Sequence, residues 1–189
     1  LRPRGKRVTV GPFEVDITDV DRQIDERLAE LQRIRSAVEV EIHAAFDVAH
    51  VHEMRAIDDW RSIPGLEVEP PHVVLYFVYP KQDAIGAWSE ATGLGADAFK
   101  DHDGFEDAFV NAITFDINAK HYAGDDGNLA FVLCHGKDLL ILKLVGYAED
   151  VITYYRLGDI TAHVWIGHHR YPTKGRVWHP GGAHPFLGT

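Results

Sequence analysis

The feature that most constrains the fold is an uninterrupted apolar run from Val73 to Tyr79, which Pro80 closes. Such a run is typical of a strand that is buried on both faces. Segments with helical periodicity lie on both sides of it, and no strict alternation of strand and helix follows. The pattern therefore predicts an α+β fold rather than a doubly wound parallel sheet.

Two periods of apolar residues predict the other elements. The helical period is clearest where Val20, Ile24, Leu28 and Leu31 recur among charged residues. Helices are expected from Thr18 or Asp19 onward, at 83–92 before two glycines, at 103–119 and at 148–155. Strands are expected at 7–15 with a break at Gly11-Pro12, at 37–42, as a hairpin of 129–134 and 139–144, and at 162–167. Residues 43–60 are ambiguous and favour a strand followed by an irregular connection, and residues 171–189 are expected to be coil.

Composition limits the class of protein. With 189 residues and no evident linker, the chain is expected to form one domain over 1–189. Its net charge of −10 argues against a nucleic-acid partner, because phosphate binding needs a basic surface. Its longest apolar stretches, such as 139–146, are too short to span a bilayer, and no signal peptide is evident. A single cysteine, Cys134, excludes an internal disulfide, so we expect a soluble cytoplasmic protein without a membrane partner.

The most distinctive residues lie near the C-terminal end. Ala162 to Gly175 reads AHVWIGHHRYPTKG, and Trp178 to Phe186 reads WHPGGAHPF. These two motifs, in this order and spacing, resemble class II glutamine amidotransferases of the glutamate-synthase-like type. Residues 70–78, the helix after residue 103 and residues 143–151 agree with that resemblance. It implies an N-terminal-nucleophile hydrolase, whose four-layer αββα sandwich would be incomplete in this chain.

The resemblance also implies which residues bind glutamine. Arg170 and Thr173 match residues that hold the substrate in the family, and His184 matches a histidine that lines the outer wall of the site. The chemistry fits, since an arginine offers two parallel donors to an α-carboxylate. Taken without the family, Arg170 could equally pair with an acidic neighbour, and His184 before Pro185 is more typical of a structural histidine.

No catalytic residue is assigned within these 189 residues. The family's nucleophile is an N-terminal cysteine, whereas residue 1 is leucine, and the Asn-Gly pair of the family's oxyanion hole does not occur. The chain is therefore expected to be a fragment of a longer domain, or else a homologue that has lost its chemistry. Cys134, in an apolar segment, is expected to be structural. Whether the chain is itself an enzyme is left open.

In the complete protein, a cysteine thiolate outside this chain would attack the glutamine side-chain amide and release ammonia. By resemblance, the ammonia would pass to a synthase subunit or domain that carries a flavin and iron–sulfur clusters. One cysteine cannot hold such a cluster, so no cofactor is expected in this chain.

Two alternatives remain. The first is a non-catalytic module that binds glutamine or acts as a scaffold with the same fold. The second is a metal-binding domain, because five histidines lie in the last thirty residues. They are His163, His168, His169, His179 and His184. No His-Glu-x-x-His or Cys-x-x-Cys pattern accompanies them, so no metal ligand is assigned.

Overall fold

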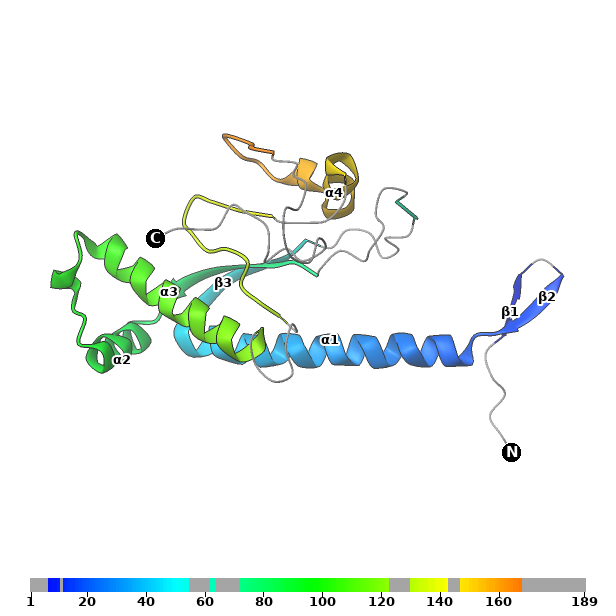
Figure 1. The fold of residues 1–189 in the computed structure, drawn as a ribbon, viewed down its shortest axis with the longest axis horizontal. Coiled ribbons are helices and arrows are strands. Elements are labelled where there is room, and N and C mark those ends of the chain that lie inside the picture. The colour runs from blue at the N-terminus through cyan, green and yellow to red at the C-terminus, as the bar shows by residue number, and fades with distance from the viewer. Residues whose placement is uncertain are drawn as a thin grey trace, which may run out of the picture. The chain divides into compact units, whose positions relative to one another are not determined.

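A computed structural model describes residues 7–10, 12–54, 62–63, 72–122, 130–142 and 147–167. The chain divides into two compact units, one of residues 1–44 with 114–131 and one of residues 45–113 with 132–189. The described elements are α-helices and two antiparallel two-stranded sheets, which confirms the predicted α+β class (Figure 1). The single domain expected over 1–189 stays a prediction. Among the described residues, no helix combines the length and apolar character needed to cross a lipid bilayer.

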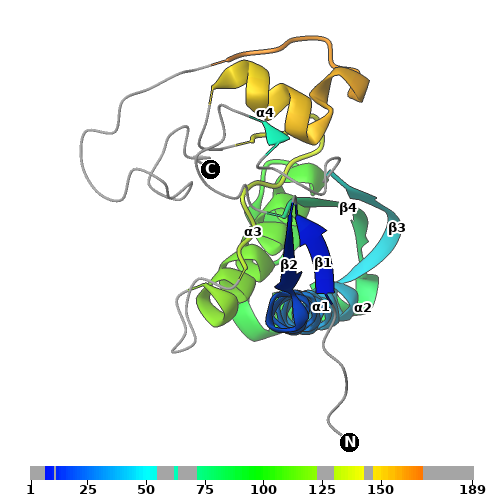
Figure 2. The same cartoon turned by 90° about the vertical axis from the view of Figure 1, so that its right-hand side faces the viewer.

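The first unit begins with a hairpin followed by a long helix. Strands β1 (Arg7–Val10) and β2 (Phe13–Asp16) lie side by side (Figure 2) and pair antiparallel. Val10 is opposite Phe13 in their register. The break expected at residues 11–12 therefore separates two strands. Helix α1 (Thr18–Ala45) follows, with acidic residues in its first turn and a histidine in its last, as the helix dipole favours.

The strand expected at 37–42 is wrong, because these residues continue α1. Burial explains the error: Ile34 and Ile42 are buried, whereas Val40 is 66% exposed. Residues eight apart share a helix face, while an alternating strand would place Val40 and Ile42 on the same side. The apolar residues at 38, 40 and 42 thus fit two periods, and the structure follows the helical one.

Helix α3 (His102–His121) contributes its last two turns to the first unit. There Lys120 forms an ion pair with Glu41 of α1, and Ile117 is buried. The backbone amide of Ala130 donates a hydrogen bond to the carbonyl oxygen of His121. Beside it, the ring centroids of Tyr122 and Phe131 lie 5.3 Å apart. The Lys120–Glu41 pair joins α1 to the end of α3, and the other two contacts hold residues 130–131 against that end.

The sheet of the second unit consists of β3 (Phe46–Glu53) and β4 (Val74–Pro80), which pair antiparallel with a bulge between Val48 and His50. The strand expected at 73–79 is confirmed. The prediction that this strand is buried on both faces is wrong, since Phe77 is 53% and Tyr79 is 69% exposed. In the described part of the chain β3 is the only strand that pairs with β4.

Two groups of apolar side chains form the core of the second unit. In one, Phe109 is fully buried, with ring centroids 5.7 Å from Phe46 and 5.8 Å from Trp88 of α2 (Gln82–Thr92). The other group centres on α4 (Ala148–Tyr155) and the short 3-10 helix η3 (Leu157–Asp159). Its buried members are Met54, Ile63, Tyr154, Tyr155 and Leu157.

Three expected strands are absent from the described residues. Residues 130–134 and 139–142 are not paired as strands, although Cys134 and Ile141 are in contact. Residues 162–167 are irregular, and Val164 is 73% and Ile166 is 89% exposed. A strand is stabilised by a neighbour's hydrogen bonds, and alternation in the sequence does not supply that neighbour.

Candidate functional site

The three residues expected to bind glutamine, Arg170, Thr173 and His184, lie outside the described residues. Their grouping into one site therefore stays a prediction. The structure does describe residues 162–167, immediately before this motif, and they form no strand. The strand expected at 162–167, which would end three residues before Arg170, is therefore wrong.

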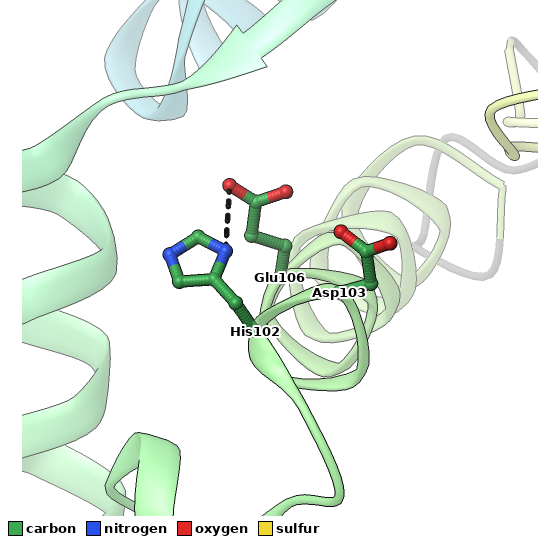
Figure 3. A group of neighbouring side chains, drawn as sticks. All are labelled: His102, Asp103 and Glu106. Atoms are coloured by element: carbon green, nitrogen blue, oxygen red, sulfur yellow. Dashed lines mark ion pairs between the residues drawn. The ribbon is translucent and has the colours of Figure 1, made fainter.

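Polar side chains gather at the first turn of α3. His102, Asp103 and Glu106 each offer a ligand atom, and these atoms lie within 4.8 Å of one another (Figure 3). The Nδ1 atom of His102 is 3.5 Å from Oε1 of Glu106, as expected for residues four apart on a helix. The cluster is open to solvent, since the side chains of His102 and Asp103 are 69% and 73% exposed.

Local sequence places this cluster at a helix start. The carboxylate of Asp101 accepts a hydrogen bond of 2.9 Å from the backbone amide of Gly104. Its backbone carbonyl accepts another from the amide of Phe105. Asp101 thereby satisfies an amide that the first turn of a helix leaves without a partner. The next residues then project their side chains from the first turn of α3.

A cation of the protein itself already pairs with the two carboxylates. The Nζ atom of Lys137 lies 2.6 Å from Oδ1 of Asp103 and 3.4 Å from Oε2 of Glu106. The hydrogen bond from Lys137 lowers the pKa of Asp103, and the attraction between their charges adds to it. The same hydrogen bond is the main reason why the pKa of Lys137 is raised. Both groups are therefore charged at neutral pH.

The chemistry of this cluster is that of an ion-pair network. A divalent cation would need the carboxylate oxygens that Lys137 now contacts, and so would compete with an ammonium group for them. Lys137 lies 34 residues from Asp103 in the sequence, so the network ties the segment after Cys134 to the start of α3. Exposed pairs of this kind contribute little to stability.

Cys134 is held by the backbone of a neighbouring segment. Its Sγ atom accepts a hydrogen bond from the amide of Ile141 at 3.3 Å and lies 3.5 Å from the carbonyl oxygen of the same residue. The adjacent His135 has its Nε2 atom 2.8 Å from Oδ1 of Asn111. A catalytic thiol needs a base within hydrogen-bonding reach, and the neighbouring imidazole is occupied elsewhere. This geometry agrees with a structural role for Cys134.

The comparisons with known proteins give one relative of limited coverage. The chain is 37% identical over 82 residues to an uncharacterized protein of Archaeoglobus fulgidus. The match covers 43% of this chain and 20% of that protein, so it spans about a fifth of the relative's length. No family model matches the chain, and no solved structure matches it significantly.

The cluster on α3 was not expected from the sequence, although a signal was present. His102 and Glu106 are four residues apart, which places them on one helix face, but the helix was expected to begin only at Asp103. The contact with Lys137 had no signal, because it joins segments far apart in the sequence. Of the five histidines behind the metal-binding alternative, only His163 lies in the described part of the chain, so that alternative stays untested.

Proposed function

We propose that this chain forms the glutamine-binding part of a class II glutamine amidotransferase domain of the glutamate-synthase-like type. The observation that carries the proposal is the pair of motifs GHHRYPT at 167–173 and GAHPF at 182–186, in that order and spacing. The α+β class of the described residues is compatible with it. The proposal includes the finer architecture, an αββα sandwich to which β3 and β4 would contribute.

Arg170 is the residue on which binding depends most. Its guanidinium would donate two parallel hydrogen bonds to the α-carboxylate of glutamine, and the Thr173 hydroxyl would contact the substrate nearby. His184 would line the outer wall of the site. In a chain with a net charge of −10, a free amino acid needs such a local cation, because the average field repels its carboxylate.

The reaction proposed for the complete domain is hydrolysis of the glutamine amide. A cysteine thiolate attacks the amide carbon, the C–N bond breaks, and the nitrogen leaves as ammonia after taking up a proton. Water then hydrolyses the glutamyl thioester to glutamate and restores the thiol. In this proposal the thiolate comes from outside these 189 residues. Cys134 is their one cysteine, and its sulfur accepts a hydrogen bond from the backbone amide of Ile141. The ammonia would be used by a synthase partner with a flavin and iron–sulfur clusters.

Titration calorimetry with L-glutamine tests the binding step in the full chain. Arg170→Ala should weaken binding by about tenfold to a hundredfold, the worth of a charge-assisted hydrogen bond. Arg170→Lys should restore part of it, because the charge remains but the fork is lost. Arg22→Ala is the matched control, since Arg22 is 58% exposed on α1 and pairs with Asp19 and Glu26 of the same helix. Equal affinity of the wild type and Arg170→Ala would refute the assignment of Arg170.

The hydrogen bonds between the Cys134 sulfur and the backbone of Ile141 indicate a structural thiol. They favour a second candidate, a module that binds glutamine without hydrolysing it. A diazoketone analogue of glutamine, which alkylates activated cysteines, separates the two. The protein is purified from its natural source for this test: glutamine binding at an intact mass near 21.2 kDa with no adduct would support the non-catalytic module. A larger mass with one adduct on an N-terminal cysteine would support the amidotransferase. An adduct on Cys134 would show that its thiol is activated and would contradict the structural role that the geometry gives it.

A further inference from the structure

The first half of α1 carries an apolar stripe that remains exposed. Val20, Ile24 and Leu28 are 53%, 51% and 48% exposed, although their spacing of four residues places them on one helix face. Further along the same helix Ile34 is buried. An amphipathic helix in a protein gains most of its stability from covering such a stripe, and nothing in the described part of the chain covers this one.

The charges beside the stripe differ between its two edges. Successive helical residues turn by about 100°, so Asp21 and Asp25 lie along one edge, whereas Gln23 and Arg27 lie along the other. Two copies packed antiparallel through the stripe would bring the acidic edges of both together. Two copies packed parallel would instead bring the acidic edge of each copy against the Gln23–Arg27 edge of the other. Asp25 and Arg27 differ by two residues, about 3 Å along the helix axis, which is within reach of an ion pair.

We infer that residues 18–31 of α1 form a parallel, self-complementary docking surface for a second copy of this chain. Val20, Ile24 and Leu28 would each pack against the same residue of the second copy. Asp25 of each copy would pair with Arg27 of the other. This inference is independent of the proposed glutamine binding, since it rests on α1 alone (Figure 1).

The same charges argue against a lipid surface as the occupant. Residues 18–31 contain five acidic and two basic residues, and anionic headgroups repel such a helix. The size of the contact sets the expected affinity. Fourteen residues extend for about 21 Å, so the interface is smaller than that of a stable complex. The dimer should therefore dissociate in the micromolar range and respond to protein concentration.

Sedimentation equilibrium of the full chain, from low micromolar to several hundred micromolar, tests the inference. The wild type should pass from 21.2 kDa towards twice that mass as the concentration rises. Ile24→Glu should weaken the association at least about tenfold, because it buries two unpaired carboxylates in the seam. Ala29→Glu, an exposed residue on the far side of the same helix, is the control and should leave the association unchanged. Far-UV circular dichroism confirms that each variant keeps its helices.

Charge reversal tests the parallel orientation. Arg27→Asp should weaken the dimer, since it would face Asp25 of the second copy, and the double variant Asp25→Arg/Arg27→Asp should restore it. A wild type that stays monomeric throughout would overturn the inference, as would equal effects of Ile24→Glu and Ala29→Glu. A dimer that Arg27→Asp leaves unchanged would overturn the parallel arrangement.

Discussion

Truncation of Phe109 to alanine should be among the most destabilising single changes in the second unit. Its side chain has no exposed surface, and its ring contacts those of Phe46 at 5.7 Å and Trp88 at 5.8 Å. A buried Phe→Ala change costs about 3–5 kcal/mol in lost burial and residual cavity. Because two aromatic contacts are lost as well, we expect a value in the upper half of that range. This is a large share of the stability of an ordinary domain.

Urea unfolding followed by tryptophan fluorescence measures the loss, since Trp88 reports on the contact directly. Phe115→Ala is the matched control: the residue is on the same helix and is 74% exposed, so its free energy of unfolding should change by about 0.5 kcal/mol or less. If Phe109→Ala does not fold, Phe109→Leu should lose about 1–2 kcal/mol, because it keeps most of the volume. Equal losses for Phe109→Ala and Phe115→Ala would refute the reasoning from burial.

Two further predictions concern α2 and the ion-pair network. Gly93 ends α2 at a φ of 71°, so Gly93→Ala should cost about 1 kcal/mol in urea unfolding, whereas Gly86→Ala inside the same helix should gain about 0.5–1 kcal/mol. A Gly93→Ala variant that is as stable as the wild type, or gains as much as Gly86→Ala, would contradict the left-handed cap. The lowered pKa of Asp103 contributes stability that is present above about pH 4 and is lost as the pH falls through the pKa of Asp103 in the folded state. The raised pKa of Lys137 contributes stability that is lost only above about pH 10. Urea midpoints of the wild type and Lys137→Met should therefore differ at pH 7 and converge below pH 4, and a constant difference would exclude the pair as its source.

Helices were predicted well because their signals are local. Helix α4 has the expected bounds of 148–155, and α2 and α3 begin one residue before the expected positions. The end of α2 was also expected, since the glycine at position 93 adopts the left-handed conformation that a helix C-terminus favours. Periodicity and end residues are written in the segment itself, so no tertiary contact is needed to find them.

Strands were predicted less well because alternation is an incomplete signal. Residues 74–80 form a strand where β3 provides a partner, whereas 162–167 and 130–134 have similar apolar content and form none among the described residues. At 37–42, apolar residues satisfied both periods, and the long helical stretch before them decided the outcome. Pairing depends on residues that are distant in sequence, and these cannot be read from one segment.

The candidate sites differ in the same way. Arg170, Thr173 and His184 were found through a motif, which is local, but their arrangement depends on residues beyond the described part of the chain. The network at Asp103 is the reverse case. Its geometry is clear, yet it depends on Lys137, which only the fold brings near. The motif therefore predicts a chemistry whose geometry is not described, whereas the structure describes the geometry of an ion-pair network that the sequence did not predict.

The exposure of residues 162–167 bears on how tightly Arg170 can hold a ligand. An arginine fork gains from its geometry only when the backbone before it is fixed, and fixing a residue costs about 1–2 kcal/mol. With Val164 73% and Ile166 89% exposed, apolar burial does not offset that cost in the described structure. Glutamine would then have to order this segment as it binds, which reduces its affinity. A strand that paired with residues 162–167 and covered Val164 and Ile166 would remove that cost in advance. Such a partner should strengthen glutamine binding without touching the ligand.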